Sequence, residues 1–170
     1  MNKLVLLLFI STGFANAEIT VDNFSDRSVK PTVHSNNKSL TVTKAVGGAC
    51  WNKAESAYGV PAKLLYAIAK VETNLQPNKI GLNKDGSMDI GLMQINNRWL
   101  PTLRKFNISQ QDLFDPCINV MVGAWILADN IQRLGYNWNA VGAYNAKTIW
   151  KRDIYAKKVH KAIIELGYNQ

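Results

Sequence analysis

Hydrophobic positions recur at helical spacing along most of the chain after residue 47. They predict helices over residues 50–58, 61–73, 94–106, 109–113, 115–134, 137–144 and 151–166. Pro101 interrupts the third of these, and Ser109 and Asp112 have the spacing of a capping box at the fourth. Residues 74–89 are polar and contain glycine, so we expect a loop there. The pattern therefore predicts a mainly α domain over residues 47–170.

Residues 1–17 have the layout of a secretory signal peptide. Lys3 precedes an apolar run over residues 4–10, and a small-residue cleavage pattern ends at Ala17. The run is shorter than the roughly 20 apolar residues that a membrane span needs, and an uncleaved membrane anchor is the alternative. Residues 18–46 lack a sustained helical pattern, so we expect a flexible tail. The mature chain is then expected in the periplasm or secreted, without a transmembrane segment.

Composition and charge narrow the classes of partner. The 170 residues are 47% hydrophobic and 19% charged, which excludes a disordered chain and allows one compact domain. Lysine and arginine number 20 against 12 acidic residues, so the net charge is +8. A basic chain attracts polyanions such as nucleic acid, anionic lipid or an acidic wall polymer. Export argues against cytoplasmic nucleic acid as the partner.

Two cysteines, Cys50 and Cys117, would lie in an oxidising compartment after export. A bridge between them would close a loop of 66 intervening residues and stabilise the fold by about 4 kcal/mol. Two free buried thiols are the alternative. A zinc site is not expected, because His34 and His160 lie far apart in the chain and no C-x-x-C spacing is present.

One carboxylate lies on the apolar side of a predicted helix. On a helical wheel of residues 61–73, Glu72 falls between Ile68 and Leu65. Burial there raises the pKa of a carboxyl group, so that it holds a proton near neutral pH as a general acid must. The alternative is a glutamate at a helix end that reaches solvent or pairs with a lysine.

Three motifs carry a family resemblance. Residues 65–74 with Glu72-Thr73, the Gly-Leu-Met-Gln of residues 91–94, and the Ala-Tyr-Asn-Ala of residues 143–146 occur in one order. Together they resemble the soluble lytic transglycosylase family, whose fold is similar to goose-type lysozyme. The likeness covers roughly residues 50–166. It is closest to small exported transglycosylases of type III and type IV secretion, conjugation and pilus machines, which often carry cysteines placed like Cys50 and Cys117.

The resemblance implies cleavage of the bond between N-acetylmuramic acid and N-acetylglucosamine in peptidoglycan. Glu72 would act first as acid and then as base, and the muramyl C6 hydroxyl would close on C1 to give a 1,6-anhydro end. Neither a metal nor a cofactor is implied. The expected partners are glycan strands and components of a secretion, conjugation or pilus apparatus, and we expect a monomer.

The resemblance also implies substrate-binding roles for six residues: Thr73, Gly91, Met93, Gln94, Tyr144 and Asn145. The backbone at Gly91 would approach the sugar, Met93 would border the cleft, and Gln94 would bind an N-acetyl or hydroxyl group. Tyr144 would aim its hydroxyl at Glu72 or at the substrate, with Asn145 holding it. Two positions depart from the family pattern, since Thr73 stands where serine is usual and Lys147 where glycine often follows.

Three alternatives stay open. A two-carboxylate hydrolase would need a second acid about 5 to 9.5 Å from the first. Asp89 is the better candidate for this acid and Asp85 the weaker one. The simpler interpretation of Asp89 is a loop or cap residue that bonds the backbone. A non-catalytic wall-binding module would also carry the positive charge. The basic positions near the C-terminus either attract anionic peptide stems or form the solvated face of an end helix: Lys147, Lys151, Arg152, Lys157, Lys158 and Lys161. Trp125 is expected in the core, and the other tryptophans are left between core and sugar stacking.

Overall fold

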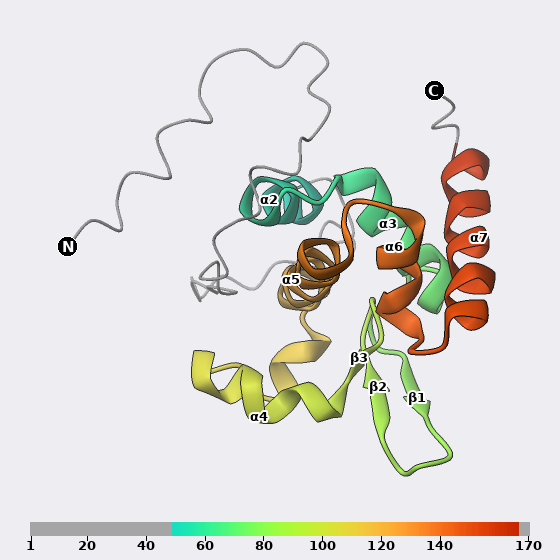
Figure 1. Cartoon of the computed structure of the whole chain (residues 1–170). Coiled ribbons are helices and arrows are strands. Elements are labelled where there is room, and N and C mark those ends of the chain that lie inside the picture. Colours follow the sequence, from blue (N-terminus) through green and yellow to red (C-terminus); the bar gives the residue numbers. More distant parts are fainter. Residues whose placement is uncertain (1–48, 167–170) are drawn as a thin grey trace.

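Helices make up most of residues 49–166, which is the part of the chain that the computed structural model describes (Figure 1). The larger ones are α2 (Ala49–Tyr58), α3 (Ala62–Thr73), α5 (Pro116–Leu134), α6 (Trp138–Asn145) and α7 (Ile149–Glu165). The mainly α prediction is confirmed for this region. The predicted signal peptide and tail lie outside the described residues.

Helix α3 packs against both α2 and α7, and its apolar stripe lies in the core. Leu65 and Ile68 are completely buried, as the helical wheel predicts. Asn74 ends the helix in the left-handed conformation, with a φ of 52°, and its backbone N–H caps the carbonyl of Lys70. The last turn of α3, which carries Glu72, is therefore fixed by core packing and by the cap at Asn74.

A small antiparallel sheet occupies the segment that was predicted as a loop. Strands β1 (Ile80–Leu82), β2 (Met88–Ile90) and β3 (Ile95–Asn96) pair in that order, and Asp89 of β2 lies opposite Gly81 on β1 and Asn96 on β3. The loop prediction for residues 74–89 is therefore wrong at β1 and at most of β2, and the helix prediction for residues 94–106 is wrong at β3. Strands of two or three residues are too short to show the alternation that identifies a strand.

The remaining boundaries follow the predictions closely. The interrupted helix begins after β3 and consists of a 3-10 turn (Asn97–Trp99), α4 (Leu100–Leu103) and a second 3-10 turn (Arg104–Phe106). The capping box is present before a further 3-10 turn (Gln111–Phe114), because the N–H of Ser109 donates to Asp112 Oδ2 at 2.8 Å and the N–H of Asp112 donates back to Ser109 Oγ at 3.3 Å.

A disulfide joins Cys50 on α2 to Cys117 at the start of α5. The bridge confirms the predicted pairing and excludes the alternative of two free thiols. It closes a loop that contains α3 and the whole sheet, and the chain-entropy argument assigns it about 4 kcal/mol. The bridge therefore links two helices that also pack against each other.

Helix α5 is the most apolar helix and runs through the centre of the fold. Trp125 on α5 is half-buried against the core, with its ring edge-on to that of Trp99 at 5.3 Å. Within residues 49–166, none of the helices combines the length and the apolarity that crossing a bilayer requires.

Candidate active site

Glu72 lies in the last turn of α3, where that helix packs against α7. Its Oε1 accepts a hydrogen bond of 2.5 Å from the hydroxyl of Tyr155 on α7. The pKa of Glu72 is raised from 4.5 to about 7, with burial as the largest cause and the charge of Asp89 acting in the same direction. The hydrogen bond from Tyr155 and the charge of Lys158 act in the opposite direction. The side chain is therefore able to hold a proton near neutral pH and to release it there.

Tyr155 is a site residue that sequence reasoning missed. It lies on the buried face of α7 with Val159 and Ala162, one and two turns further along the helix. A tyrosine on such a face places a hydroxyl in the core, where it needs a partner. That requirement is the only sign of its role in the sequence, because Tyr155 and Glu72 are 83 residues apart.

Tyr144 was expected to aim its hydroxyl at Glu72 or at the substrate, and the first of these contacts is absent. Its hydroxyl donates to the carbonyl of Met93 at 2.9 Å, whereas Glu72 is bonded by Tyr155. Burial raises the pKa of Tyr144 well above its usual value, and the charges of Glu72 and Asp89 add to the effect. The charges of both carboxylates therefore act on Tyr144, although its hydroxyl makes its hydrogen bond to Met93 and not to Glu72. Asn145 is exposed at the end of α6.

A buried asparagine, Asn119 of α5, holds the loop that follows β2. Its Oδ1 accepts the N–H of Met93 at 2.7 Å, and its Nδ2 donates to the carbonyls of Ile90 at 2.9 Å and Leu113 at 2.7 Å. Gly91 has a φ of +76°, and a Cβ at this position would overlap Asn119 Nδ2 and the Leu113 carbonyl. The absence of a side chain at Gly91 thus allows Asn119 to approach the loop. The sequence predicted a different role, in which the backbone at Gly91 approaches the sugar.

Thr73 ties the end of α3 to the same loop. Its hydroxyl is buried and donates to the carbonyl of Leu92 at 2.8 Å, so the hydrogen bonding expected of this position is retained with threonine. Met93 is completely buried, and its sulfur lies 2.6 Å from where a Cβ on Gly123 would be. The side chain of Met93 therefore packs in the core and does not border open space, contrary to the expectation from sequence.

Gln94 follows in a left-handed backbone conformation, with a φ of 50°. Its Nε2 donates to the carbonyls of Gly91 at 2.9 Å and Lys79 at 3.2 Å. Its Oε1 lies 2.8 Å from where a Cβ on Gly81 would be, so a glycine in β1 makes room for it. A non-glycine residue with positive φ is strained, and such strain is common at functional sites. The amide of Gln94 is half-buried and held by the backbone on both sides of the loop.

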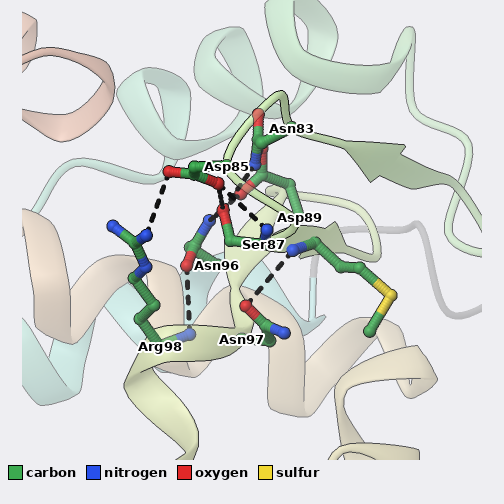
Figure 2. A network of polar contacts seen from close by, with 8 residues as sticks. Asn83, Asp85, Ser87, Asp89, Asn96, Asn97 and Arg98 are labelled. Carbon is green, nitrogen blue, oxygen red and sulfur yellow. Dashed lines mark hydrogen bonds and ion pairs between the residues drawn. The ribbon is translucent and has the colours of Figure 1, made fainter.

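Asp89 is held by a network of polar side chains on the sheet (Figure 2). Asn83 Nδ2 donates to its Oδ2 at 2.9 Å, and Asn96 Nδ2 donates to its Oδ1 at 2.7 Å. Ser87 Oγ accepts a hydrogen bond from each of the two asparagines at 3.1 Å. Asp89 is therefore a strand residue bonded by side-chain amides, and not a loop or cap residue bonded by the backbone. Two amide donors therefore fix the orientation of the carboxylate.

Asp85, the weaker candidate for a second acid, shapes the hairpin turn. Its Oδ1 accepts the N–H and the hydroxyl of Ser87, and its Oδ2 pairs with Arg98 at 3.0 Å (Figure 2). The hydrogen bonds from Ser87 lower the pKa of this exposed carboxyl, with Arg98 contributing in the same direction. These contacts give Asp85 a structural role in the turn.

The basic C-terminal region divides into structural and exposed positions. Arg152 is half-buried and donates to the Ala146 carbonyl at 3.0 Å and to Asn139 Oδ1 at 3.2 Å. Lys161 pairs with Glu165 at 3.6 Å on the surface of α7. Lysines 147, 151, 157 and 158 are exposed.

A hollow of about 740 Å³ lies at the other end of α3. It is lined by aliphatic and aromatic side chains, among them Leu64, Ile163 and the half-exposed Trp138, whose ring stands edge-on to His160 at 5.1 Å. Leu64 precedes Glu72 by eight residues, or about 12 Å along the helix axis. This hollow is therefore separate from the two carboxylates. Trp51 is a core residue, edge-on to Tyr66.

Substituting Tyr155 by phenylalanine is expected to change the pH dependence of activity. The hydrogen bond from Tyr155 lowers the pKa of Glu72, so its loss raises that pKa and keeps the acid protonated to higher pH. The alkaline limb of the kcat/KM profile is expected to move up by about one pH unit. Tyr58→Phe is the matched control, because that buried hydroxyl has no hydrogen-bond partner within residues 49–166. An unmoved limb in Tyr155→Phe would contradict this role.

Comparisons with known proteins identify one family and several similar proteins. Residues 49–165 match the family described as Transglycosylase SLT domain. The chain is 50% identical over 117 residues to the invasion protein IagB of Salmonella typhimurium strain LT2, across 68% of this chain and 73% of that protein. It is 39% identical over 136 residues to a peptidoglycan-binding-like protein of Escherichia coli O157:H7, across 72% and 81% of the two chains. It is 35% identical over 123 residues to protein IpgF of Shigella flexneri, across 69% and 81%.

Proposed function

This chain belongs to the transglycosylase SLT domain family, and on that premise we propose that it cleaves the bond between N-acetylmuramic acid and N-acetylglucosamine and leaves a 1,6-anhydro-muramyl end. The mainly helical domain fits the lysozyme-like fold that this family implies. One observation carries the proposal: a half-buried glutamate, Glu72, whose pKa of about 7 lets it give and take a proton near neutral pH.

The proposed reaction uses that one proton-transfer group twice. Protonated Glu72 donates its proton to the glycosidic oxygen, the bond from C1 to that oxygen breaks, and the bonding pair leaves with the oxygen. The muramyl ring then carries oxocarbenium character. Ionised Glu72 next takes the proton of the C6 hydroxyl, whose oxygen bonds to C1. Water is not consumed, and Glu72 returns to its protonated form.

The surrounding residues would support these steps. The carboxylate of Asp89, fixed by Asn83 and Asn96, would stabilise the developing oxocarbenium ion electrostatically. We propose Gln94 and Asn145 as substrate-binding residues at the edge of this site. Thr73, Gly91, Met93 and Tyr144 support the proposal differently, because their contacts hold the loop that carries Gln94.

Mass analysis of digested peptidoglycan tests the reaction type. The proposal expects muropeptides that end in the anhydro form, one water lighter than those with reducing ends. Products with reducing ends only would overturn it in favour of hydrolysis.

A hydrolase is the second candidate function, because the charge of Asp89 acts on Glu72 and both carboxylate oxygens of Asp89 accept hydrogen bonds from asparagine side chains. Asp89→Asn separates the two. The substitution removes a charge that raises the pKa of Glu72, so the alkaline limb of the activity profile is expected to move to lower pH. We expect a loss of kcat of about tenfold to a hundredfold, with anhydro ends still the product.

Asp129→Asn is the control for this experiment, since it removes a carboxylate at the surface of α5, outside the network around Asp89, and is expected to leave kcat and the limb unchanged. Hydrolysis by the wild type that disappears in Asp89→Asn would instead assign Asp89 to a two-carboxylate mechanism.

We further propose that the enzyme acts in the periplasm and opens the wall locally for a secretion, conjugation or pilus machine. The support is the disulfide, which suits an oxidising compartment, and the similarity to proteins named for invasion. The intact mass of protein recovered from the periplasm tests export. The expected mass is that of a chain beginning at Glu18, and retention of the full chain in the cytoplasm would contradict it.

A further inference from the structure

Two lysines of α7 flank the tyrosine that contacts Glu72. Lys151 precedes Tyr155 by four residues and Lys158 follows it by three, so both lie on the same side of the helix as Tyr155. The hydroxyl of Tyr155 is 2.5 Å from Glu72, and the charge of Lys158 acts on Glu72 directly. Helix α7 therefore presents two positively charged side chains next to the proposed catalytic acid.

Neither lysine forms an ion pair in the described part of the chain. Of the ion pairs between residues 49 and 166, none includes Lys151 or Lys158, whereas Lys161 on the same helix pairs with Glu165. Lys151 lies over the ring of Trp150, with its Nζ 5.4 Å from the ring centroid. Both cations are thus available to an anionic group from outside the chain.

Large apolar side chains lie exposed beside the same lysines. Trp150 is 60% exposed and Ile154, between the two lysines, is 48% exposed. Exposed apolar surface next to unpaired charge is typical of a binding surface and unusual for a simply solvated helix face. We call Trp150, Lys151, Ile154 and Lys158 the α7 strip.

We propose that the α7 strip binds the peptide stem that muramic acid carries on its lactyl group, so that the enzyme favours peptide-bearing over stem-free glycan. The inference rests on the proposed function, because the stem is attached to the same muramyl ring whose glycosidic bond Glu72 would cleave. A stem leaving that ring beside Glu72 would meet α7, the helix that contacts this carboxylate.

The chemistry of the stem matches that of the strip. A wall peptide presents free carboxylates separated by short alkyl segments. Lys151 and Lys158 are seven residues apart, about 10 Å along the helix, which places two cations at a spacing that neighbouring carboxylates of an extended peptide can reach. Ile154 and Trp150 lie between and beside them, where the alkyl segments would pack.

Binding to two forms of the wall tests the proposal in the full chain. The Glu72→Gln protein, in which cleavage is removed, is titrated with intact sacculi and with sacculi whose stems have been removed by an amidase. Adding Lys151→Gln and Lys158→Gln is expected to weaken binding to intact sacculi about tenfold and to leave binding to stem-free sacculi unchanged. The matched control is Lys157→Gln with Lys105→Gln, which removes the same charge from exposed positions outside the strip.

Equal weakening on both kinds of sacculi, or equal weakening by the control pair, would overturn the proposal and leave only general attraction of a basic surface to the wall. Unchanged binding to intact sacculi would overturn it as well. The reaction of the wild type on stem-free strands separates failure of the stem site from failure of the proposed function. If anhydro products form on these strands, the proposed reaction stands and only the stem-binding proposal is overturned. In the wild-type background, Lys151→Gln alone is expected to raise KM on intact wall with kcat unchanged, since only the charge of Lys158 acts on Glu72.

Discussion

Replacing Glu72 with glutamine is expected to lower the rate of peptidoglycan cleavage at least about a thousandfold, because a positioned general acid contributes roughly 10² to 10⁴ and this group would act in both steps. Glutamine keeps the size of the side chain and an oxygen that accepts the hydrogen bond from Tyr155. It has no acidic proton to donate. The measurement is the release of soluble muropeptides from purified sacculi, with binding to the same sacculi measured in parallel.

Glu55→Gln is the control, since Glu55 is a half-buried glutamate on α2 and belongs to a different part of the fold. We expect it to cleave like the wild type. Loss of cleavage with retained sacculus binding in Glu72→Gln would exclude a purely wall-binding role. Wild-type cleavage by Glu72→Gln would contradict the assignment of the acid.

Replacing Asn119 with leucine is expected to lower the free energy of unfolding by about 5 kcal/mol, because three buried backbone groups would lose their partner at about 1 to 3 kcal/mol each. These are the N–H of Met93 and the carbonyls of Ile90 and Leu113. The loop between β2 and β3 carries Gln94 and adjoins Asp89, so cleavage should fall as well. Urea unfolding followed by circular dichroism measures the first effect, and muropeptide release measures the second.

The same helix offers a matched control. Asn130 on α5 is also buried, but its Nδ2 has no hydrogen-bond partner in the described residues and its Oδ1 accepts only from Arg133. Asn130→Leu is therefore expected to change the unfolding free energy by less than about 1 kcal/mol. Similar losses from both substitutions would show that Asn119 does not hold the loop as described.

Helical periodicity and chain punctuation are sufficient to predict most helices of this chain. Gly59 follows α2, Pro61 precedes α3, and Gly135 follows α5, each at a boundary that the pattern places within two residues. The sheet is not predictable in the same way, because its strands are two or three residues long. Its stability comes from pairing and from the side-chain network around Asp89, which are contacts between segments.

The candidate site shows the same difference between residues that the local sequence pattern identifies and residues that depend on contacts between segments. Glu72 is predictable because a carboxylate in an apolar stripe is visible within one helix. Tyr155 and Asn119 are not, because their roles depend on hydrogen bonds to residues 83 and about 30 positions away. Gly91 shows the intermediate case: the sequence marks a glycine whose close contact matters, and only the tertiary fold identifies Asn119 as that contact.

The most direct measurement is a titration of the Glu72 side-chain carboxyl followed by carbon-13 NMR, with the Glu72→Gln protein used to assign the signal. A half-buried acid under the influence of the Asp89 charge is expected to titrate with a pKa of about 7, above the ordinary value of 4.5. A midpoint at or below 4.5 would mean that Glu72 is ionised at neutral pH and would contradict its role as the proton donor.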